Sequence, residues 1–186
     1  MTDRHSPAHD HPPRTSGASS RPRVRAATPD DLAAVAAIFA PYARTTAVTF
    51  DEEPPTVEQW AARLADAGAR GLPFLVAELD GAVVGYAYAT GWRAKAAYRF
   101  TAEHSIYLDP RAQGRGIGTL LLSALLDACT LAGVRQVVAV IADDPAAAGS
   151  IPLHRRLGFA PAGTLHDVGF KHGRWVSTVL MQRTLH

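Results

Sequence analysis

Hydrophobic residues recur along the chain at two spacings, which predict alternating strands and helices. Over residues 32–39 the apolar positions lie three or four residues apart, which predicts a helix with one buried face that ends near Pro41. A capping-box pattern that begins at Thr56 predicts a second helix, which ends near Gly68. Strands are predicted over 23–27, 74–79, 82–90, 99–108, 136–141, 160–168 and 175–183, and further helices over 119–132 and 146–157. About seven strands and four helices in this order indicate an α+β fold.

The first 22 residues differ from the rest, because they are rich in Pro, Ser, His and Arg and contain almost no large aliphatic side chains. Such a segment cannot bury enough apolar surface to offset the entropy cost of ordering its backbone. A disordered tail is therefore expected over 1–22 and one folded domain over 23–186. Nothing fixes the geometry of His5, His9 and His11, so solvated histidines are expected there and no metal site.

Composition and charge exclude several classes of protein. The 186 residues include 19 Lys and Arg against 17 Asp and Glu, and a net charge of +2 is too small to predict a nucleic-acid partner. No run approaches the roughly 20 apolar residues that cross a bilayer, so no membrane partner is expected and a cytoplasmic location is predicted. The single Cys129 excludes an internal disulfide framework, and its position beside Leu125 and Leu126 predicts core packing and not an acyl carrier.

The first chemical signal is the glycine-rich segment Gln-Gly-Arg-Gly-Ile-Gly at 113–118, between a predicted strand and a predicted helix. Glycines let the backbone approach a ligand closely, and the helix N-terminus adds partial positive charge, which suits a pyrophosphate. A Walker loop would continue with Lys and Ser or Thr, but Gly118 is followed by Thr119 and Leu120. A dinucleotide fingerprint would need a glycine where this chain has Leu121.

The remaining pattern, Gln/Arg-x-x-Gly-x-Gly, resembles the pyrophosphate loop of the GNAT acetyltransferases, although an ordinary glycine-rich turn is the alternative. Further segments carry the resemblance: Thr-Phe-Asp at 49–51, Trp-Arg-Ala-Lys-Ala-Ala-Tyr-Arg at 92–99, Thr-Ala-Glu-His-Ser-Ile-Tyr-Leu at 101–108, Val-Ala-Val-Ile at 138–141, Ser-Ile-Pro-Leu-His-Arg-Arg-Leu-Gly-Phe at 150–159 and Gly-Phe-Lys-His-Gly-Arg-Trp at 169–175. Their order and spacing resemble the phosphinothricin N-acetyltransferase branch of that superfamily, from about Val24 to Leu185.

The resemblance implies a GNAT fold, with a central mixed but mostly antiparallel sheet flanked by helices. It also implies that acetyl-CoA is the co-substrate and that a metal is not required. The acceptor would be the α-amine of a small amino acid or analogue, such as phosphinothricin, methionine sulfoximine or methionine sulfone. Transfer would be direct, without an acyl-enzyme, and the enzyme would be a homodimer.

Matched position by position, the resemblance implies that Glu103 is the general base and that Arg93 and Lys95 bind the acidic groups of the substrate. Lys95 replaces the more usual arginine, which loses a bidentate contact. The acetyl-CoA contacts would be Ile106, Tyr107, Leu108, Gln113, Gly114, Arg115, Gly116, Ile117 and Gly118. Ala147 stands where the branch has an asparagine directed toward the cofactor, in a segment one residue longer than usual. Weaker cofactor binding, or another group in that role, is therefore expected.

The chemistry requires a base, because an amine at neutral pH is mostly ammonium and has no lone pair for attack. Glu103 can serve if burial raises its pKa, while an exposed cross-strand charge is the alternative. On a strand, Glu103 shares a face with Ser105 and Tyr107, whereas His104 points to the other face. Both would meet the same acceptor only if the strand is bulged. His104 is the alternative base, although a packed or solvated histidine explains it as well.

The same chemistry requires an oxyanion donor and a proton for the leaving thiolate. A backbone N–H near Tyr107 or Leu108 would stabilise the oxyanion. His154 stands where other GNAT enzymes place a tyrosine acid, and as an imidazolium it would protonate the thiolate; packing beside Phe159 is the alternative. Candidate apolar walls of the substrate pocket are Phe50, Trp92 and Tyr98.

Other functions remain open from the sequence. The same transfer could act on a polyamine, an aminoglycoside or a protein N-terminus, although Arg93 and Lys95 disfavour polycations through charge repulsion. A catalytically silent CoA-binding module is a rival that Ala147 keeps open. Lys171 and Arg174 flank a predicted turn, where contacts with substrate or with a second subunit are an alternative to solvation.

Overall fold

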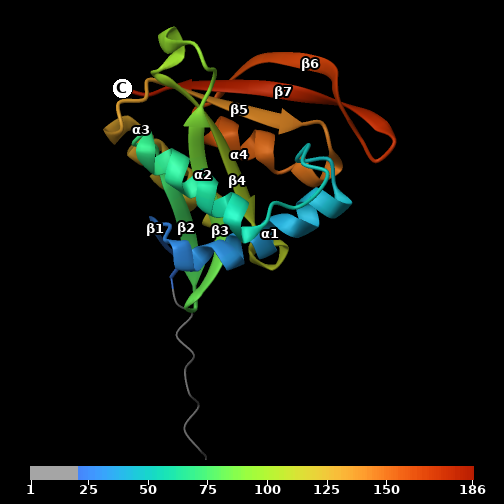
Figure 1. Cartoon of the computed structure of the whole chain (residues 1–186). Coiled ribbons are helices and arrows are strands. Elements are labelled where there is room, and N and C mark those ends of the chain that lie inside the picture. The colour runs from blue at the N-terminus through green and yellow to red at the C-terminus, as the bar shows by residue number, and fades with distance from the viewer. Residues whose placement is uncertain (1–20) are drawn as a thin grey trace, which may run out of the picture.

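A seven-stranded sheet with strand order β1-β2-β3-β4-β5-β7-β6 runs through the computed structural model, which describes residues 21–186 (Figure 1). Its strands are Arg23–Ala26 (β1), Phe74–Leu79 (β2), Ala82–Gly91 (β3), Thr101–Leu108 (β4), Gln136–Ala142 (β5), Ala160–Lys171 (β6) and Arg174–Thr184 (β7). Neighbouring strands are antiparallel except β4 and β5, which are parallel. The α+β fold class expected from the sequence is confirmed.

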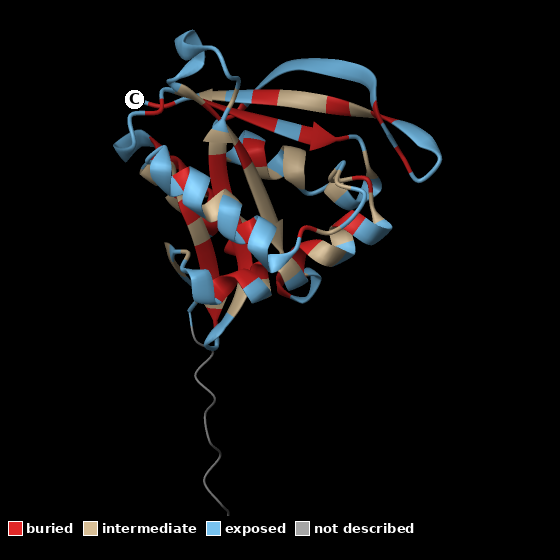
Figure 2. Cartoon of the chain, in the orientation of Figure 1, coloured by how far each residue is buried: buried red, intermediate tan, exposed pale blue. Residues whose placement is uncertain are grey.

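Four α-helices in the described part of the chain cover the two faces of this sheet. They are Leu32–Thr45 (α1), Val57–Ala69 (α2), Ile117–Leu131 (α3) and Ser150–Arg156 (α4). α1 and α2 pack on one face against β2 and β3, where Trp60 of α2 joins Phe74 and Tyr86 of the strands in an aromatic cluster. α3 packs on the opposite face against small side chains such as Ala87 and Ala89. Buried positions accordingly follow the sheet and the inner sides of the helices, whereas β6 is exposed along most of its length (Figure 2).

α1 continues past Pro41 to Thr45, so the predicted helix end at Pro41 is wrong. A proline removes one backbone donor and crowds the preceding turn, which usually ends a helix. The residues after it compensate, because Ala43 is fully buried and the Tyr42 hydroxyl donates to the carbonyl of Leu108 over 2.6 Å. Tertiary contacts thus outweigh the local preference.

Two other boundaries differ from the sequence expectation. The single helix expected over 146–157 is a short 3₁₀ turn, Pro145–Ala147, followed by α4. β6 and β7 extend to a tight hairpin at His172-Gly173, where both residues have positive φ, 50° and 74°. This is the backbone conformation of a two-residue turn whose twist matches the strands. The tail predicted over 1–22, with its histidines, lies almost wholly outside the described residues.

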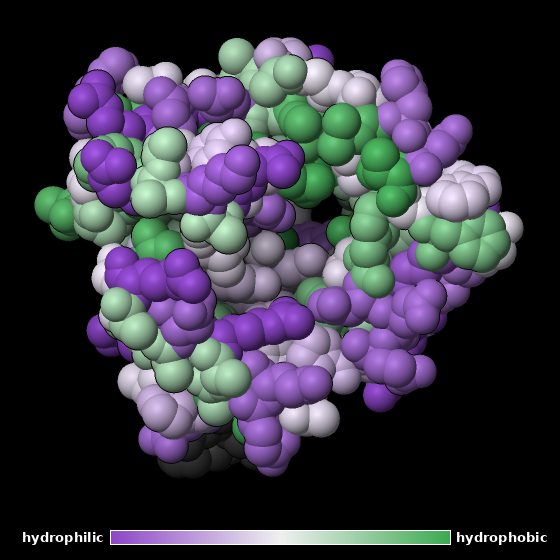
Figure 3. All heavy atoms as spheres, turned by 45° about the horizontal axis from the view of Figure 1, so that its top comes forward, coloured by the Kyte–Doolittle hydropathy of each residue, from purple (hydrophilic) through white to green (hydrophobic). Residues whose placement is uncertain are grey.

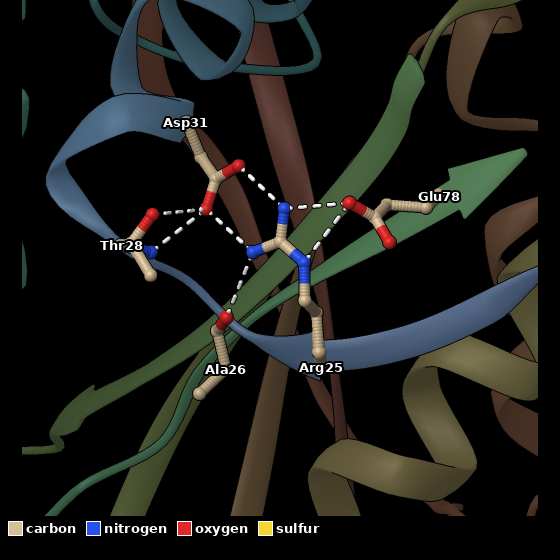
Figure 4. Close-up of polar contacts among 5 residues, drawn as sticks. All are labelled: Arg25, Ala26, Thr28, Asp31 and Glu78. Carbon is tan, nitrogen blue, oxygen red and sulfur yellow. Dashed lines mark hydrogen bonds and ion pairs between the residues drawn. The ribbon is translucent and has the colours of Figure 1, made fainter. Parts of the chain in front are cut away.

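The first strand of the domain, β1, is held in place by Arg25, whose guanidinium lies between two carboxylates (Figure 4). It donates to both oxygens of Asp31 at 2.7 Å and to Glu78 at 2.7 and 3.0 Å. Asp31 also accepts from the backbone and hydroxyl of Thr28, at the start of the first helical turn. Arg25 lowers the pKa of Asp31 to about 2, so the ion pair ties β1, β2 and α1 together.

Within residues 21–186, no helix has the length and the apolar character needed to cross a membrane.

Asp31→Asn is expected to lower the free energy of unfolding by about 2 kcal/mol at pH 7, as the depressed pKa of Asp31 implies. Ionised Asp31 stabilises the fold above its unfolded pKa, and this contribution is lost as the pH falls toward its folded pKa. The stability difference should therefore narrow below about pH 4 in urea unfolding curves. Asp66→Asn, which removes the exposed pair with Arg70, should cost less than about 0.5 kcal/mol. Equal losses in the two variants would contradict a special role for Asp31.

Candidate functional site

The parallel pairing of β4 and β5 is short, and the two strands separate after it. Pairing runs only from Thr101 opposite Gln136 to His104 opposite Ala139. Beyond that point β4 stays paired with β3 up to Leu108, and β5 stays paired with β7. A wedge therefore opens in the middle of the sheet.

Backbone polar groups of both strands face this wedge. The N–H of Asp109 donates to β3, and alternation along β4 turns the backbone groups of Ile106 and Leu108 away from β3 into the wedge. The N–H of Asp143 donates to β7, so the backbone groups of Val140 face the wedge from the other side. The Leu108 carbonyl accepts from the Tyr42 hydroxyl, and a ligand that carries amides can supply partners to the other groups.

A cavity of about 660 Å³ occupies the wedge and continues beyond it. It is lined by β4 from Glu103 to Leu108, by β5 from Ala139 to Ala142, and by parts of α1, α4 and the segment 48–51. Figure 3 shows the molecule hollowed near the centre of one face, with apolar residues along part of the rim. Apolar walls with a few polar groups are typical of a small-molecule site.

The glycine-rich segment lies at one end of the cavity. Gly114 and Gly116 have positive φ, 73° and 77°, and Gly116 is the N-cap of α3. The first-turn N–H groups of α3 lack intrahelical acceptors, and the helix dipole adds positive charge, which makes an anion site. Gln113 donates to the Tyr42 hydroxyl over 3.0 Å, which connects this segment to α1.

Two residues of the predicted cofactor set do not line the cavity with their side chains. Arg115 points to solvent, and Ile117 is buried in the core on the inner side of α3. Either can contribute to a ligand only through its backbone. The ring of Tyr107 lines the cavity from the aromatic cluster, 4.9 Å from Phe39 between centroids.

Glu103 lines the cavity at the head of the wedge and is partly buried. Burial raises the pKa of its carboxyl above its ordinary value. His104 lines the same cavity although it points to the opposite face, and the β3–β4 register shows no bulge. Both residues thus border one cavity from opposite faces of β4 without a bulge. Whether both meet one acceptor stays a prediction.

His104 and His154 form a buried pair, with the two Nε2 atoms 3.0 Å apart and the rings stacked at 5.0 Å. His154 Nδ1 lies 2.7 Å from the Ser150 carbonyl oxygen, one turn earlier in α4. A carbonyl only accepts, so His154 Nδ1 carries a proton and donates it. Burial lowers the pKa of both rings, that of His104 to about 3, so both are neutral.

The expected role of His154 as an imidazolium donor does not fit this geometry. Its Nδ1 hydrogen is held by Ser150, its Nε2 faces His104, and burial disfavours its cationic form. His154 packs edge-on against Phe159 at 4.9 Å, which is the packing alternative. His154 itself also lines the cavity.

The segment 46–53, between α1 and α2, forms another wall with Val48, Thr49, Phe50 and Asp51. Lys171 of β6 holds this wall, because its Nζ donates to the carbonyls of Thr49 and Asp51 over 2.8 and 2.7 Å. The lysine is 3% exposed, and burial lowers its pKa. A Cβ on Gly169 would lie 2.3 Å from the Phe50 ring, so only glycine admits the ring there.

The single chain does not bring Arg93, Lys95 and Tyr98 into the cavity. They lie exposed in the connection between β3 and β4, which projects from the end of the sheet in Figure 1. The Arg93 guanidinium lies 5.2 Å from the ring centroid of Trp92. Of the four predicted substrate residues, only Phe50 lines the cavity.

Ala147 lines the cavity but offers no polar side-chain group. The neighbouring carboxylate of Asp144 is committed elsewhere, since it accepts from the N–H groups of Ala146 and Ala47 and from Arg174. It therefore does not replace the asparagine expected at 147.

Sequence reasoning missed Tyr42 and Gly169 as parts of the site, and it gave Lys171 only an alternative role in contacts with substrate or a second subunit. The only sequence signal for Gly169 was its place in the segment 169–175. Among the described residues, no group of three or more His, Cys, Asp or Glu side chains is placed to hold a metal ion.

Comparison with known proteins agrees with this geometry. The sequence model of the Acetyltransferase (GNAT) family matches residues 32–159. A phosphinothricin N-acetyltransferase from Alcaligenes faecalis is 48% identical over 163 residues, which cover 88% of this chain and 82% of that protein. An L-methionine sulfoximine/L-methionine sulfone acetyltransferase from Salmonella typhimurium is 38% identical over 165 residues, covering 87% and 94%. The crystal structure of a GNAT phosphinothricin acetyltransferase from Sinorhizobium meliloti in complex with AcCoA has a TM-score of 0.83 at 44% identity, covering 88% of each chain. The chain belongs to the GNAT family of acetyltransferases.

Proposed function

We propose that this enzyme transfers the acetyl group of acetyl-CoA directly to the α-amine of a small amino acid or analogue, with Glu103 as general base. The observation that carries the proposal is one cavity with an amide-rich anion site at 113–118 and a partly buried carboxylate at the head of the wedge. The relatives named for phosphinothricin and methionine sulfoximine support this acceptor class.

The cavity fits acetyl-CoA, which when bound supplies an electrophilic acetyl carbon. The segment 113–118 would hold its diphosphate. The backbone groups of Ile106 and Val140 would pair with the amides of its pantetheine arm. The N–H of Leu108 also suits the oxyanion, whereas the N–H of Tyr107 points toward β3 by strand alternation.

Glu103 would take the proton of the substrate ammonium, and its raised pKa brings it closer to that task. Direct transfer is supported by the burial and the raised pKa of the Cys129 thiol. This thiol is fully buried in the core below α3, and burial raises its pKa to about 12. It is therefore neither accessible nor nucleophilic enough to carry an acyl group.

Arg93 and Lys95 remain proposed ligands of the substrate's acidic group. Gly91 pairs with Ala102, so the β3–β4 connection begins at the end of β4 that carries Glu103. Movement of this exposed connection toward the cavity would bring the two cations and Tyr98 to the amine site. Phe50 would supply the apolar wall.

A homodimer in the cytoplasm belongs to the same proposal. The homodimer is supported by the exposed apolar surface of the β6–β7 hairpin. There Trp175 is 62% exposed, and the centroid of its ring lies 5.1 Å from that of Phe170. Leu165 and Val168 extend this surface along the edge strand. Exposed apolar patches of this kind mark protein contacts.

The test follows free thiol release from acetyl-CoA with phosphinothricin, methionine sulfoximine, methionine sulfone, polyamines and peptides as acceptors. Turnover of the amino-acid analogues is expected. Turnover of peptides alone would overturn the acceptor class, and acetyl-CoA binding without any turnover would indicate a silent module.

Glu103→Gln should lower kcat/KM by about 100-fold or more, since general bases contribute at least this much. The acid limb of the pH–rate profile should disappear in this variant. In the unchanged enzyme, the apparent pKa of that limb should lie above the ordinary pKa of a glutamate. Glu58→Gln, at an exposed glutamate on α2, is the control. A loss of less than about tenfold would exclude Glu103 as the base.

Ala147→Asn should tighten acetyl-CoA binding by about two- to tenfold, because it adds a hydrogen-bonding group to the cavity wall. Calorimetric titration measures the Kd. Ala148→Asn, on the exposed neighbouring residue, should leave the Kd unchanged. Unchanged or weaker binding by Ala147→Asn would show that the cofactor does not need a side chain there.

Lys171→Met should raise the acceptor KM by about tenfold, because the carbonyls of Thr49 and Asp51 lose a buried donor and the wall at 46–53 loosens. The Kd of acetyl-CoA should stay within about twofold, since 113–118 is not touched. His166→Gln, at an exposed residue of β6, is the matched control. Equal changes in KM and Kd would indicate general destabilisation.

A further inference from the structure

One cation at the acceptor end of the cavity has no assigned role. Arg63 of α2 lines the cavity beside Asp51. The other arginine of the lining, among the described residues, is Arg156 of α4. α4 packs beside the start of α3, since a Cβ on Gly118 would lie 3.5 Å from the Leu153 side chain. Arg63 is therefore the cation that the single chain already presents at the acceptor end.

Arg63 is oriented by a buried ring. Its guanidinium carbon lies 4.7 Å from the ring centroid of Trp60, which is three residues earlier on the same face of the helix. Trp60 is fully buried in the aromatic cluster, so its ring is a fixed support. A guanidinium that stacks on an aromatic face keeps its N–H edges available for an anion. The Arg63 side chain is 34% exposed, which leaves it accessible to a ligand.

The ion pair of Arg63 leaves most of its donors unused. Within the described chain, its single ion pair joins Nη2 to Oδ2 of Asp51 over 3.5 Å. That distance exceeds the roughly 2.8 Å of a charge-assisted hydrogen bond, and the Asp51 side chain is itself 38% exposed. Arg25, in contrast, makes bonds of 2.7 to 3.0 Å with two carboxylates. A bidentate anion would therefore gain more from Arg63 than the release of Asp51 costs.

Arg63 and Glu103 border the cavity from the same side of the sheet. Burial raises the pKa of the Tyr107 hydroxyl, Asp51 raises it further and Arg63 lowers it, so both charges lie near that hydroxyl. Tyr107 and Glu103 share one face of β4 by alternation, and Tyr107 packs in the cluster that α1 and α2 cover. An acceptor with its amine at Glu103 can thus direct an acidic group along β4 toward Arg63.

We propose that Arg63 is a specificity-determining residue that binds an acidic group of the acceptor, and that Asp51 competes with the acceptor for its guanidinium. The group is an oxyanion, either the α-carboxylate or a side-chain phosphinate. The inference rests on the proposed function and deepens it, because it names a residue that selects acidic amines. It leaves Arg93 and Lys95 a role, since phosphinothricin carries two acidic groups, and it requires no movement of the β3–β4 connection.

Arg63→Gln should raise the KM of acidic acceptors by about tenfold and leave kcat within about threefold, because Arg63 does not touch the reacting atoms. The acceptors compared are phosphinothricin, methionine sulfone and the carboxamide of methionine sulfone, which lacks the carboxylate. The KM of the carboxamide should stay within about twofold. A rise for both acids identifies the α-carboxylate as the group bound, and a rise for phosphinothricin alone identifies the phosphinate.

Two further variants separate binding from a structural role. Arg70→Gln, which removes an exposed arginine at the end of α2, is the control and should leave every KM unchanged. Arg63→Lys keeps the charge and should raise the KM less than Arg63→Gln does. An equal rise for the carboxamide, or a KM of both acids within about twofold of that of the unchanged enzyme, would overturn the role of Arg63.

Asp51→Asn tests the competition, because it removes the charge that faces Arg63 and nearly preserves the size of the side chain. The KM of the acidic acceptors should fall by about two- to threefold. An ion pair that only braces the cavity wall would give the opposite sign, with the KM raised in both variants. An unchanged or raised KM in Asp51→Asn would overturn the competitor role.

The same assays separate this inference from the proposed function. Turnover of acidic acceptors by Arg63→Gln with an unchanged KM would overturn the inference alone. Absence of turnover by the unchanged enzyme with every amine would overturn the proposed function and the inference together.

Discussion

The site depends on the early end of the β4–β5 pairing. Both strands are interior strands, and each keeps its outer partner after they separate at His104 and Ala139. Their inner backbone groups are thereby left without a ladder partner in the middle of a sheet. Because unpaired buried backbone groups are costly, this geometry favours a ligand that itself carries amides. The N-terminus of α3 then supplies an anion site at one end of the same opening.

Burial acts on the pKa values of three side chains at the head of this opening. Burial raises the pKa of Glu103 and lowers those of His104 and His154, so each of the three groups is shifted toward its neutral form. Burial of this kind disfavours the ammonium relative to the free amine, and the free amine is the state that attacks. The buried cation nearby, Lys171, is turned to the carbonyls of the segment 46–53 and does not line the cavity.

The sequence predicted those features that depend on local patterns. Alternation and three-four spacing identified the strands and helices, and the glycines of 113–118 identified the turn that begins α3, because both are properties of neighbouring residues. The anion site at this turn stays a prediction. The continuation of α1 past Pro41 depends on contacts of Ala43 and Tyr42 with distant elements, and no local pattern encodes it. The pairing of His104 with His154, 50 residues apart, likewise arises only when α4 packs beside β4. Arg93 and Lys95 were matched as site residues, but the chain alone leaves them outside the cavity.

The two ends of the cavity differ in whether backbone groups or side chains line them. The proposed acetyl-CoA end uses mainly backbone groups, at 113–118 and along Ile106 and Leu108, so most side chains there can change without loss of the hydrogen-bonding pattern. The proposed acceptor end uses side chains on the segment 46–53. Lys171 of the β6–β7 hairpin donates to carbonyls of this segment, and Gly169 leaves room for one of its rings. Substitutions in that hairpin can therefore alter which amine is accepted while the binding of the acetyl donor is retained. A fold arranged in this way can keep one donor and change acceptors, since the constraint on each lies in a separate part of the chain.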